Sequence, residues 1–231
     1  MKGIITQSNY IPWAGFFSSM NMVDIFVVYD EMQFTKRDWR NRNLINTPKG
    51  LKWLTIPICV KGNYLQKINE CKISNFKWNI DHWNIIKENY KNAKYYKEIS
   101  MFLEPLYKNC NHVFLTDINL YFINALNHYL NINTKIITSP VVDKSIDRNQ
   151  RLIKICKDFN IINYFSGPSA KAYIEPQLFT NQNINLIFWD YNDFIKKLNR
   201  DSELKQVSII DSLFNEGPEI IKSLSVNTNL S

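Results

Sequence analysis

A short basic stretch, QFTKRDWRNRN at residues 33–43, has the composition of an anion-binding surface. It contains four cationic side chains and two asparagines, with two aromatic rings between them. A guanidinium group can bind a phosphate or carboxylate through two parallel hydrogen bonds. Solvated turns and nucleic-acid-binding arms have similar compositions. We expect the wall of an anion-binding cleft, with the candidate ligand-binding residues Gln33, Lys36, Arg37, Trp39, Asn41, Arg42 and Asn43.

Two other side chains are candidates for general acid–base catalysis. Asp30 directly follows an apolar segment, where its carboxylate could act as a base or bind a hydroxyl group. The imidazole of His82 titrates near neutral pH, which suits proton transfer. A hydrogen-bonded core histidine is the alternative, because His82 shares a helical stripe with Trp78 and Tyr90. The sequence has no Walker loop, GxGxxG motif or nucleophile elbow.

Two further segments could form ligand-binding loops. QSNYIPWAG, at residues 7–15, offers amide groups and a glycine that permits close backbone approach. In SGPSAKAY, at residues 166–173, a glycine precedes a proline at an expected helix start, where N–H groups face an anion. Either segment could instead be an ordinary turn that covers the core. The candidate ligand-binding residues here are Gln7, Asn9, Tyr10, Gly15, Ser166, Gly167, Lys171 and Tyr173, and Lys61 is a weaker candidate.

The positive charge of the chain is concentrated in one window. Residues 34–68 contain eight basic residues and one acid, a balance of +7 that equals the net charge of all 231 residues. A local positive field favours an anionic ligand. The four cysteines have no CxxC spacing, and no histidine lies at zinc-finger spacing, so we expect reduced thiols and no metal site. Nucleic-acid binding is not expected, except to a tRNA that carries an acyl donor.

The bulk composition indicates a folded globular protein, with 45% hydrophobic and 14% aromatic residues. No apolar run approaches the ~20 residues that a membrane span requires. The N-terminal apolar segment is too short for the core of a signal peptide, so we expect a cytoplasmic protein without a membrane partner.

The candidate residues need a scaffold, and apolar runs predict an α/β fold. Strands are expected at 3–7, 23–29, 135–138, 163–165 and 184–189, with a further loosely alternating strand at 66–73. Helices are expected at 14–22, 148–159 and 207–214 and throughout a helical insertion at 77–131. Two short strands around the turn at 47–50 predict a β-hairpin. Strands that alternate with helices predict a mostly parallel, Rossmann-like sheet. We expect one α/β domain over residues 1–220 and a flexible tail over 221–231.

The motifs in order resemble the WbqC-like protein family. They are QxNYxPWxGFF near the start, VVYDEMQFTKRDWRNRN, WLTIPI, Trp78 with His82, SGPSAKAY and SIIDSLFNEGPE, and they cover residues 4 to 219. Ser8 stands where a proline is common and Ser169 where a glycine is common. The motif positions are Gln7, Asn9, Tyr10, Pro12, Gly15, Asp30, Gln33, Lys36, Trp39, Asn41, Arg42, Asn43, His82, Ser166, Gly167, Lys171, Tyr173 and Asp211.

The resemblance implies a role in the biosynthesis of O-antigen or another surface polysaccharide. Our first hypothesis is a transferase that places an acyl or aminoacyl group, such as glycyl, on the amine of a nucleotide-linked sugar. The basic stretch would bind the diphosphate, and Asp30 or His82 would deprotonate the amine. An acyl-CoA, an acyl carrier, an aminoacyl-tRNA or ATP could be the co-substrate.

Two alternatives remain open at this point. The first strand, the PxxxG loop, the helix and the acid-ended second strand resemble nucleotidyltransferases of the HIGH type, which would imply an adenylate-forming enzyme. Phe16 follows Gly15 where that family has a histidine, so the likeness extends to the fold alone. The other alternative is a non-catalytic protein that binds nucleotide sugars or organises a glycosyltransferase.

Overall fold

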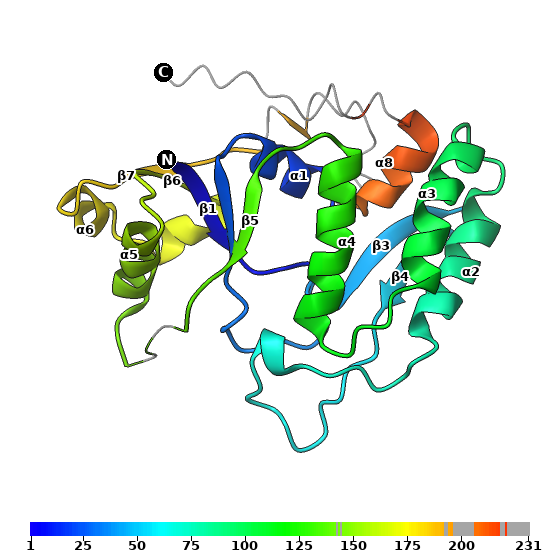
Figure 1. Ribbon diagram of the computed structural model, residues 1–231, viewed down its shortest axis with the longest axis horizontal. Helices are drawn as coiled ribbons and strands as arrows, with labels where there is room; N and C mark the ends of the chain where they lie inside the picture. The colour runs from blue at the N-terminus through cyan, green and yellow to red at the C-terminus, as the bar shows by residue number, and fades with distance from the viewer. Residues whose placement is uncertain (142, 144, 192–193, 196–205, 218–219, 221–231) are drawn as a thin grey trace.

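A five-stranded parallel sheet lies at the centre of the computed structural model, which describes residues 1–141, 143, 145–191, 194–195, 206–217 and 220 (Figure 1). Its order is β5-β2-β1-β6-β7, and every neighbouring pair is parallel. The predicted mostly parallel α/β fold is thus confirmed. The strands are β1 (Lys2–Thr6), β2 (Ile25–Val28), β5 (Lys135–Thr138), β6 (Asn163–Ser166) and β7 (Asn185–Phe188).

Alternate residues of the central strands face two separate hydrophobic cores. Ile4 and Phe26 belong to the core on one face of the sheet, whereas Ile5 and Val27 belong to the core on the other. Successive side chains of a strand point to opposite faces, so two buried faces require a continuous apolar run. Strand β2, IFVV, is such a run, and all four residues are buried.

Helices cover both faces of the sheet (Figure 1). Helices α5 (Arg148–Asp158) and α6 (Pro176–Thr180) lie on the face that includes Ile5. Helices α1 (Ala14–Asn21) and α4 (Leu115–Tyr129) lie on the opposite face. The result is three layers, with each core enclosed between the sheet and its helices.

The predicted hairpin follows β2 as a separate two-stranded antiparallel sheet. It consists of β3 (Arg42–Thr47) and β4 (Gly50–Thr55), with Arg42 opposite Thr55 and Thr47 opposite Gly50. Gly50 has a φ of 97°, a left-handed conformation that glycine adopts without a steric penalty. The turn therefore depends on this glycine.

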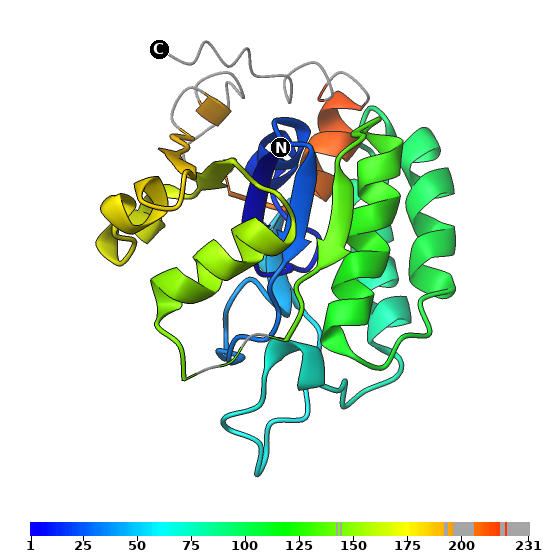
Figure 2. The same ribbon diagram turned by 60° about the vertical axis from the view of Figure 1, so that its left-hand side comes forward.

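The predicted helical insertion at 77–131 is confirmed as α2 (Trp78–Tyr90), α3 (Tyr96–Lys108) and α4, which lie together beside the hairpin (Figure 2). Helix α8 (Ile209–Glu216) packs near them, with the Ser208 hydroxyl capping its first turn. Among the described residues, no helix has the length and apolar character that crossing a membrane requires.

One predicted strand is wrong. Residues 66–73 contain the 3₁₀ turn η1 (Ile68–Glu70), flanked by isolated bridges that pair Lys67 with Gln33, Lys72 with Phe114 and Ile73 with Ile58. Ile68, Cys71 and Ile73 all pack into the core, so the apolar positions of this segment are buried without a strand. A second 3₁₀ turn, η2 (Pro168–Ala172), follows β6. The predicted tail, 221–231, lies outside the described residues.

Candidate ligand-binding site

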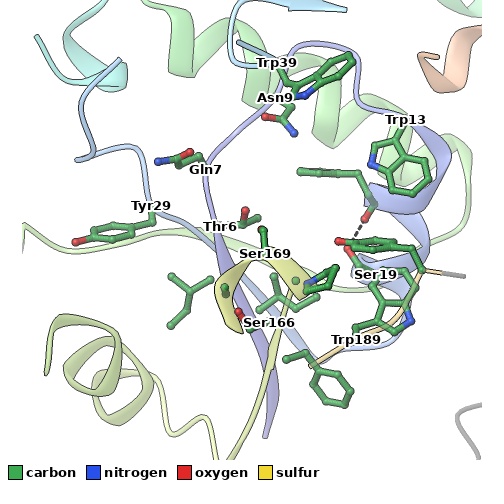
Figure 3. Close-up of a pocket in the computed structure, with 18 of the residues that line it drawn as sticks. Thr6, Gln7, Asn9, Trp13, Ser19, Tyr29, Trp39, Ser166, Ser169 and Trp189 are labelled. Carbon is green, nitrogen blue, oxygen red and sulfur yellow. Dashed lines mark hydrogen bonds between the residues drawn. The ribbon is translucent and has the colours of Figure 1, made fainter. Parts of the chain in front are cut away.

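A pocket opens where the strand order of the sheet reverses. After β1 the chain builds the sheet outward through β2, and after β6 it builds in the other direction through β7. Ligands of open parallel sheets bind beyond the carboxyl ends of strands at this switch. The pocket has a volume of about 830 Å³ and includes Thr6 and Ser166, the last residues of β1 and β6 (Figure 3).

The first wall of the pocket comes from the loops after β1 and before the hairpin. Gln7 and Asn9 extend from the end of β1, and Trp39, Arg40 and Asn43 lie in the basic stretch. The Arg40 guanidinium donates a hydrogen bond to the side-chain oxygen of Asn9. The two predicted loops, 7–15 and 33–43, therefore meet at one site.

The opposite wall comes from the third predicted loop and helix α5. Ser166, Gly167 and Ser169 line the pocket after β6, and Tyr173 follows η2. The guanidinium of Arg148, the first residue of α5, lies over the Tyr173 ring at 4.6 Å from its centroid. This wall thus adds a second cation and a half-exposed phenol ring.

Aromatic rings form one side of the pocket. The Trp13 and Tyr191 rings lie 5.1 Å apart, and the Trp189 ring lies 4.3 Å from that of Tyr191. Gly15, a predicted binding residue, is buried beneath Trp13, because a Cβ at this position would overlap the indole. Gly15 thus makes room for the ring and lines no part of the pocket itself.

The pocket is electropositive. Arg40 and Arg148 line it, and the described lining residues include no Asp, Glu, His, Cys or Lys. Burial lowers the pKa of Arg40, an effect that the carboxylates of Asp38 and Asp30 oppose. A guanidinium stays charged despite such a change. The Nε of Arg40 makes no hydrogen bond among the described residues, although it lies 3.9 Å from the Asp38 carboxylate in an ion pair.

Asp30 lies behind the pocket wall, in a buried hydrogen-bond network. Its carboxylate accepts from the Ser8 amide at 2.8 Å, the Ser8 hydroxyl at 2.6 Å and the Thr116 hydroxyl at 2.7 Å. The Asn119 amide donates to the Ser8 hydroxyl and to the backbone carbonyl of Arg40, both at 2.9 Å. Helix α4 and Asp30 therefore hold both the loop after β1 and the segment that carries Arg40.

His82 also lies outside the pocket lining, in the core between α2 and the hairpin. Its Nδ1 is 2.9 Å from the hydroxyl of Tyr10, which is 2.9 Å from the Tyr107 hydroxyl. The backbone of Thr55 on β4 is a further hydrogen-bond partner of the imidazole. Burial lowers the pKa of His82 to about 4, despite the Thr55 bond, so the imidazole is neutral near pH 7.

The remaining residues of the basic stretch point elsewhere. Lys36, Arg37 and Arg42 are absent from the described pocket lining, and the Arg42 guanidinium lies 3.8 Å from the Trp53 ring centroid on the hairpin. The side-chain amides of two asparagines hold neighbouring backbone segments in place. Asn41 donates to the Ile56 carbonyl, and Asn43 donates to the carbonyls of Tyr10 and Ile11. The predicted residues that are not among the described lining are Tyr10, Gly15, Asp30, Gln33, Lys36, Arg37, Asn41, Arg42, Lys61, His82 and Lys171.

Several lining residues were not among the predicted site residues. Arg40 and Trp13 belong to predicted loops, so their residue types could have indicated them. Arg148 and Tyr191 lie in segments without a chemical motif, and only the fold brings them to the pocket. No group of three His, Cys, Asp or Glu side chains that could hold a metal occurs within the described ranges. All four cysteines are free, and all but Cys59 are buried.

Comparison with known proteins identifies the family to which this sequence is similar. The sequence model of the WbqC-like protein family matches residues 7–223. The chain is also 40% identical over 220 residues to the uncharacterized protein Rv1507c of Mycobacterium tuberculosis, an alignment that covers 94% of this chain and 95% of the relative. No solved structure matches the chain significantly. The chain therefore belongs to the WbqC-like protein family.

Proposed function

We propose that this protein binds a nucleotide-linked amino sugar in the switch-point pocket and transfers an acyl or aminoacyl group, such as glycyl, to the sugar amine. The reaction would serve the biosynthesis of O-antigen or another surface polysaccharide, the role implied by the resemblance to WbqC-like proteins. The observation that carries the proposal is a pocket with two arginines and no carboxylate among its described lining residues.

The size and chemistry of the pocket support a nucleotide sugar as ligand. Small-molecule sites usually have volumes of about 300–1,000 Å³, and this one has about 830 Å³. The guanidinium groups of Arg40 and Arg148 would neutralise a dianionic diphosphate. The rings of Trp13, Trp189 and Tyr191 offer apolar faces for a base or a sugar. The amides of Gln7 and Asn9 would bind sugar hydroxyls.

A positively charged pocket favours the neutral form of the sugar amine, which is the form that attacks an activated acyl donor. The sugar nitrogen attacks the carbonyl carbon of the donor, the N–C bond forms, and the bond to the leaving group breaks. An α-amino group has a pKa of about 7.7–8.0, so about a tenth to a sixth of such amines are neutral at pH 7. Two nearby guanidinium groups lower the pKa of the sugar ammonium further, because like charges disfavour the protonated form. The released proton passes to the leaving group.

Asp30 and His82 have positioning roles in this proposal. Both are buried, and neither is among the described lining residues. Asp30 stabilises the loop that carries Gln7 and Asn9 through Ser8, and His82 supports the same loop through Tyr10. Their replacement should therefore disturb the pocket through its walls.

The experiment that tests the proposal is a donor screen with mass detection. The protein is incubated with nucleoside diphosphate amino sugars and with acyl-CoA, acyl-carrier and aminoacyl-tRNA donors. A product heavier than the acceptor by one acyl or aminoacyl residue is expected with one class of donor. An Arg148→Gln variant should produce less. The proposal is wrong if the acceptor binds and no donor ever yields an adduct.

A non-catalytic role is the second candidate, and one observation favours it. The described lining residues include no carboxylate, imidazole or thiol. The pocket therefore contains groups that can bind a ligand, and its described lining contains no strong base. A pure binding protein would show thermal stabilisation by nucleotide sugars and no turnover with any donor. The same donor screen thus separates the two candidates.

A further inference from the structure

The outer face of the β3–β4 hairpin is a basic and aromatic surface beside the pocket. The register pairs Arg42 with Thr55 and Leu44 with Trp53, so these side chains share one face. The opposite face includes Ile45 and Leu54, both buried in the core. The outer face is therefore the accessible one, and Trp53 is 39% exposed there.

Contacts between aromatic rings connect the outer face of the hairpin to the pocket. The ring of Trp39, which lines the pocket, lies 5.4 Å from that of Trp53. The Arg42 guanidinium lies over the Trp53 ring at 3.8 Å and donates to the Arg37 carbonyl at 2.6 Å. A row of rings and guanidinium groups thus leads away from the pocket mouth.

The row continues through the residue before Arg37. The Lys36 ammonium lies 5.3 Å from the centroid of the Tyr64 ring, and this ring is 67% exposed. Gln33 fixes the Tyr64 backbone through a hydrogen bond of 3.1 Å to its carbonyl oxygen. We name this row the hairpin ridge, and its members are Lys36, Arg37, Arg42, Trp53 and Tyr64.

The cations of the hairpin ridge have no acidic partner in the described part of the chain. The ion pairs of the basic window involve Arg40 and Lys67, and none involves Lys36, Arg37 or Arg42. Lys49 in the hairpin turn and Lys61 in the following loop add further exposed positive charge. A polyanion would therefore meet a field that no nearby carboxylate cancels.

We propose that the hairpin ridge binds the single-stranded 3′ end of an RNA, and that the donor of the transfer is an aminoacyl-tRNA. This inference rests on the proposed function. Proteins bind single strands by stacking bases on aromatic rings and by tracking the backbone with cations, and the ridge alternates these two kinds of group. Trp39 stands where the ridge meets the pocket, so a strand along the ridge would place its terminal ester at the pocket mouth.

The reaction balances without another co-reactant. The neutral sugar nitrogen attacks the ester carbonyl carbon, the N–C bond forms, and the ester C–O bond breaks. The ribose hydroxyl leaves with the proton that the nitrogen loses. No ATP is consumed in this step, because the ester is already activated.

Charge and ring content distinguish RNA from an acidic carrier protein. A carrier protein would require cations and an apolar patch, whereas bases require exposed ring faces beside cations. Arg42 over Trp53 and Lys36 over Tyr64 provide this pairing twice. The observations therefore favour RNA.

Fluorescence anisotropy with a labelled single-stranded RNA of tRNA acceptor-end sequence tests the proposal. Trp53→Ala should weaken binding at least about fivefold through lost stacking, with an unchanged salt dependence. Arg42→Gln should weaken binding and reduce the slope of log K against log salt by about 0.7. Lys154→Gln on α5, on the far side of the sheet, is the matched charge control and should change neither quantity.

The outcomes separate this inference from the proposed function. If nucleotide sugars bind and the RNA does not, or if Trp53→Ala and Lys154→Gln affect RNA equally, the ridge proposal is wrong and the proposed function stands. Competition of RNA binding by an acidic acyl carrier protein, with turnover from that carrier alone, would also overturn it. Product from an acyl-CoA or acyl-carrier donor and never from aminoacyl-tRNA would overturn the donor assignment, even if the RNA binds. Binding of nucleotide sugars and RNA with no product from any donor would instead contradict the proposed function.

Discussion

Arg40 and Arg42 are separated by one residue, yet their guanidinium groups lie on different surfaces. Arg40 lines the pocket and donates to Asn9, whereas Arg42 lies over the Trp53 ring on the hairpin. The basic stretch therefore contributes cations to two surfaces, the pocket lining and the outer face of the hairpin.

Replacement of these arginines should have separate effects. Arg40→Gln is expected to weaken the binding of a nucleoside diphosphate sugar about tenfold to 100-fold, because hydrogen bonds to charged groups contribute about 1.5–3 kcal/mol. Arg42→Gln should change that dissociation constant less than twofold. Isothermal titration calorimetry on both variants, with Lys154→Gln as a control, measures the difference. Equal losses in Arg40→Gln and Arg42→Gln would contradict the division into two surfaces.

The fold was largely predictable from sequence because its strands are buried on both faces. Short runs rich in β-branched and aromatic residues, such as IFVV in β2, favour a strand that is covered on both faces. Residues 66–73 misled the prediction, because three apolar side chains of the segment are buried while its backbone forms a 3₁₀ turn and isolated bridges. Whether such a segment forms a strand depends on the segments that pair with it. Those partners are distant in the sequence, so the local residue pattern does not reveal them.

The location of the site was partly predictable, and the orientation of its side chains was not. Loops after parallel strands converge at one edge of a sheet, so residues 7–15, 33–43 and 166–173 could be grouped in advance. Whether Arg40 or Arg42 enters the pocket depends on the register of β3 with β4, which turns Arg42 outward. Arg148 reaches the pocket from a helix that no motif marks.

Asp30→Asn should lower the free energy of unfolding by about 1–3 kcal/mol. Three donors face the carboxylate, and an amide NH₂ would replace one acceptor with a fourth donor. Chemical denaturation measures the loss, and Asp158→Asn on α5 should lie within about 0.5 kcal/mol of the parent protein. A general base would behave differently, since turnover would fall while stability stayed unchanged.

His82 should make stability depend on pH between about 4 and 6.5. Burial lowers the pKa of His82 to about 4 in the folded state, whereas an unfolded histidine titrates near 6.5. The unfolded chain binds more protons in this window, so the stabilisation is complete above about pH 6.5 and is lost as the pH falls towards 4. The loss approaches about 3 kcal/mol in denaturation curves recorded across the window.

His82→Gln should remove this part of the pH dependence, although it also lowers stability at neutral pH. His128 is exposed, so His128→Gln should leave the parent profile unchanged. An unaltered slope in His82→Gln would show that other groups cause the acid sensitivity.

Gly15 and Trp13 should be energetically coupled. A Cβ at position 15 would overlap the indole of Trp13, so Gly15→Ala is expected to cost about 1–3 kcal/mol and to weaken ligand binding at the pocket. In a Trp13→Ala background the overlap is gone, and Gly15→Ala should stabilise the protein by up to about 1 kcal/mol through the helix propensity of α1. A double-mutant cycle in thermal unfolding measures this change of sign. Additive effects would mean that Gly15 is required for the backbone and not for the position of the ring.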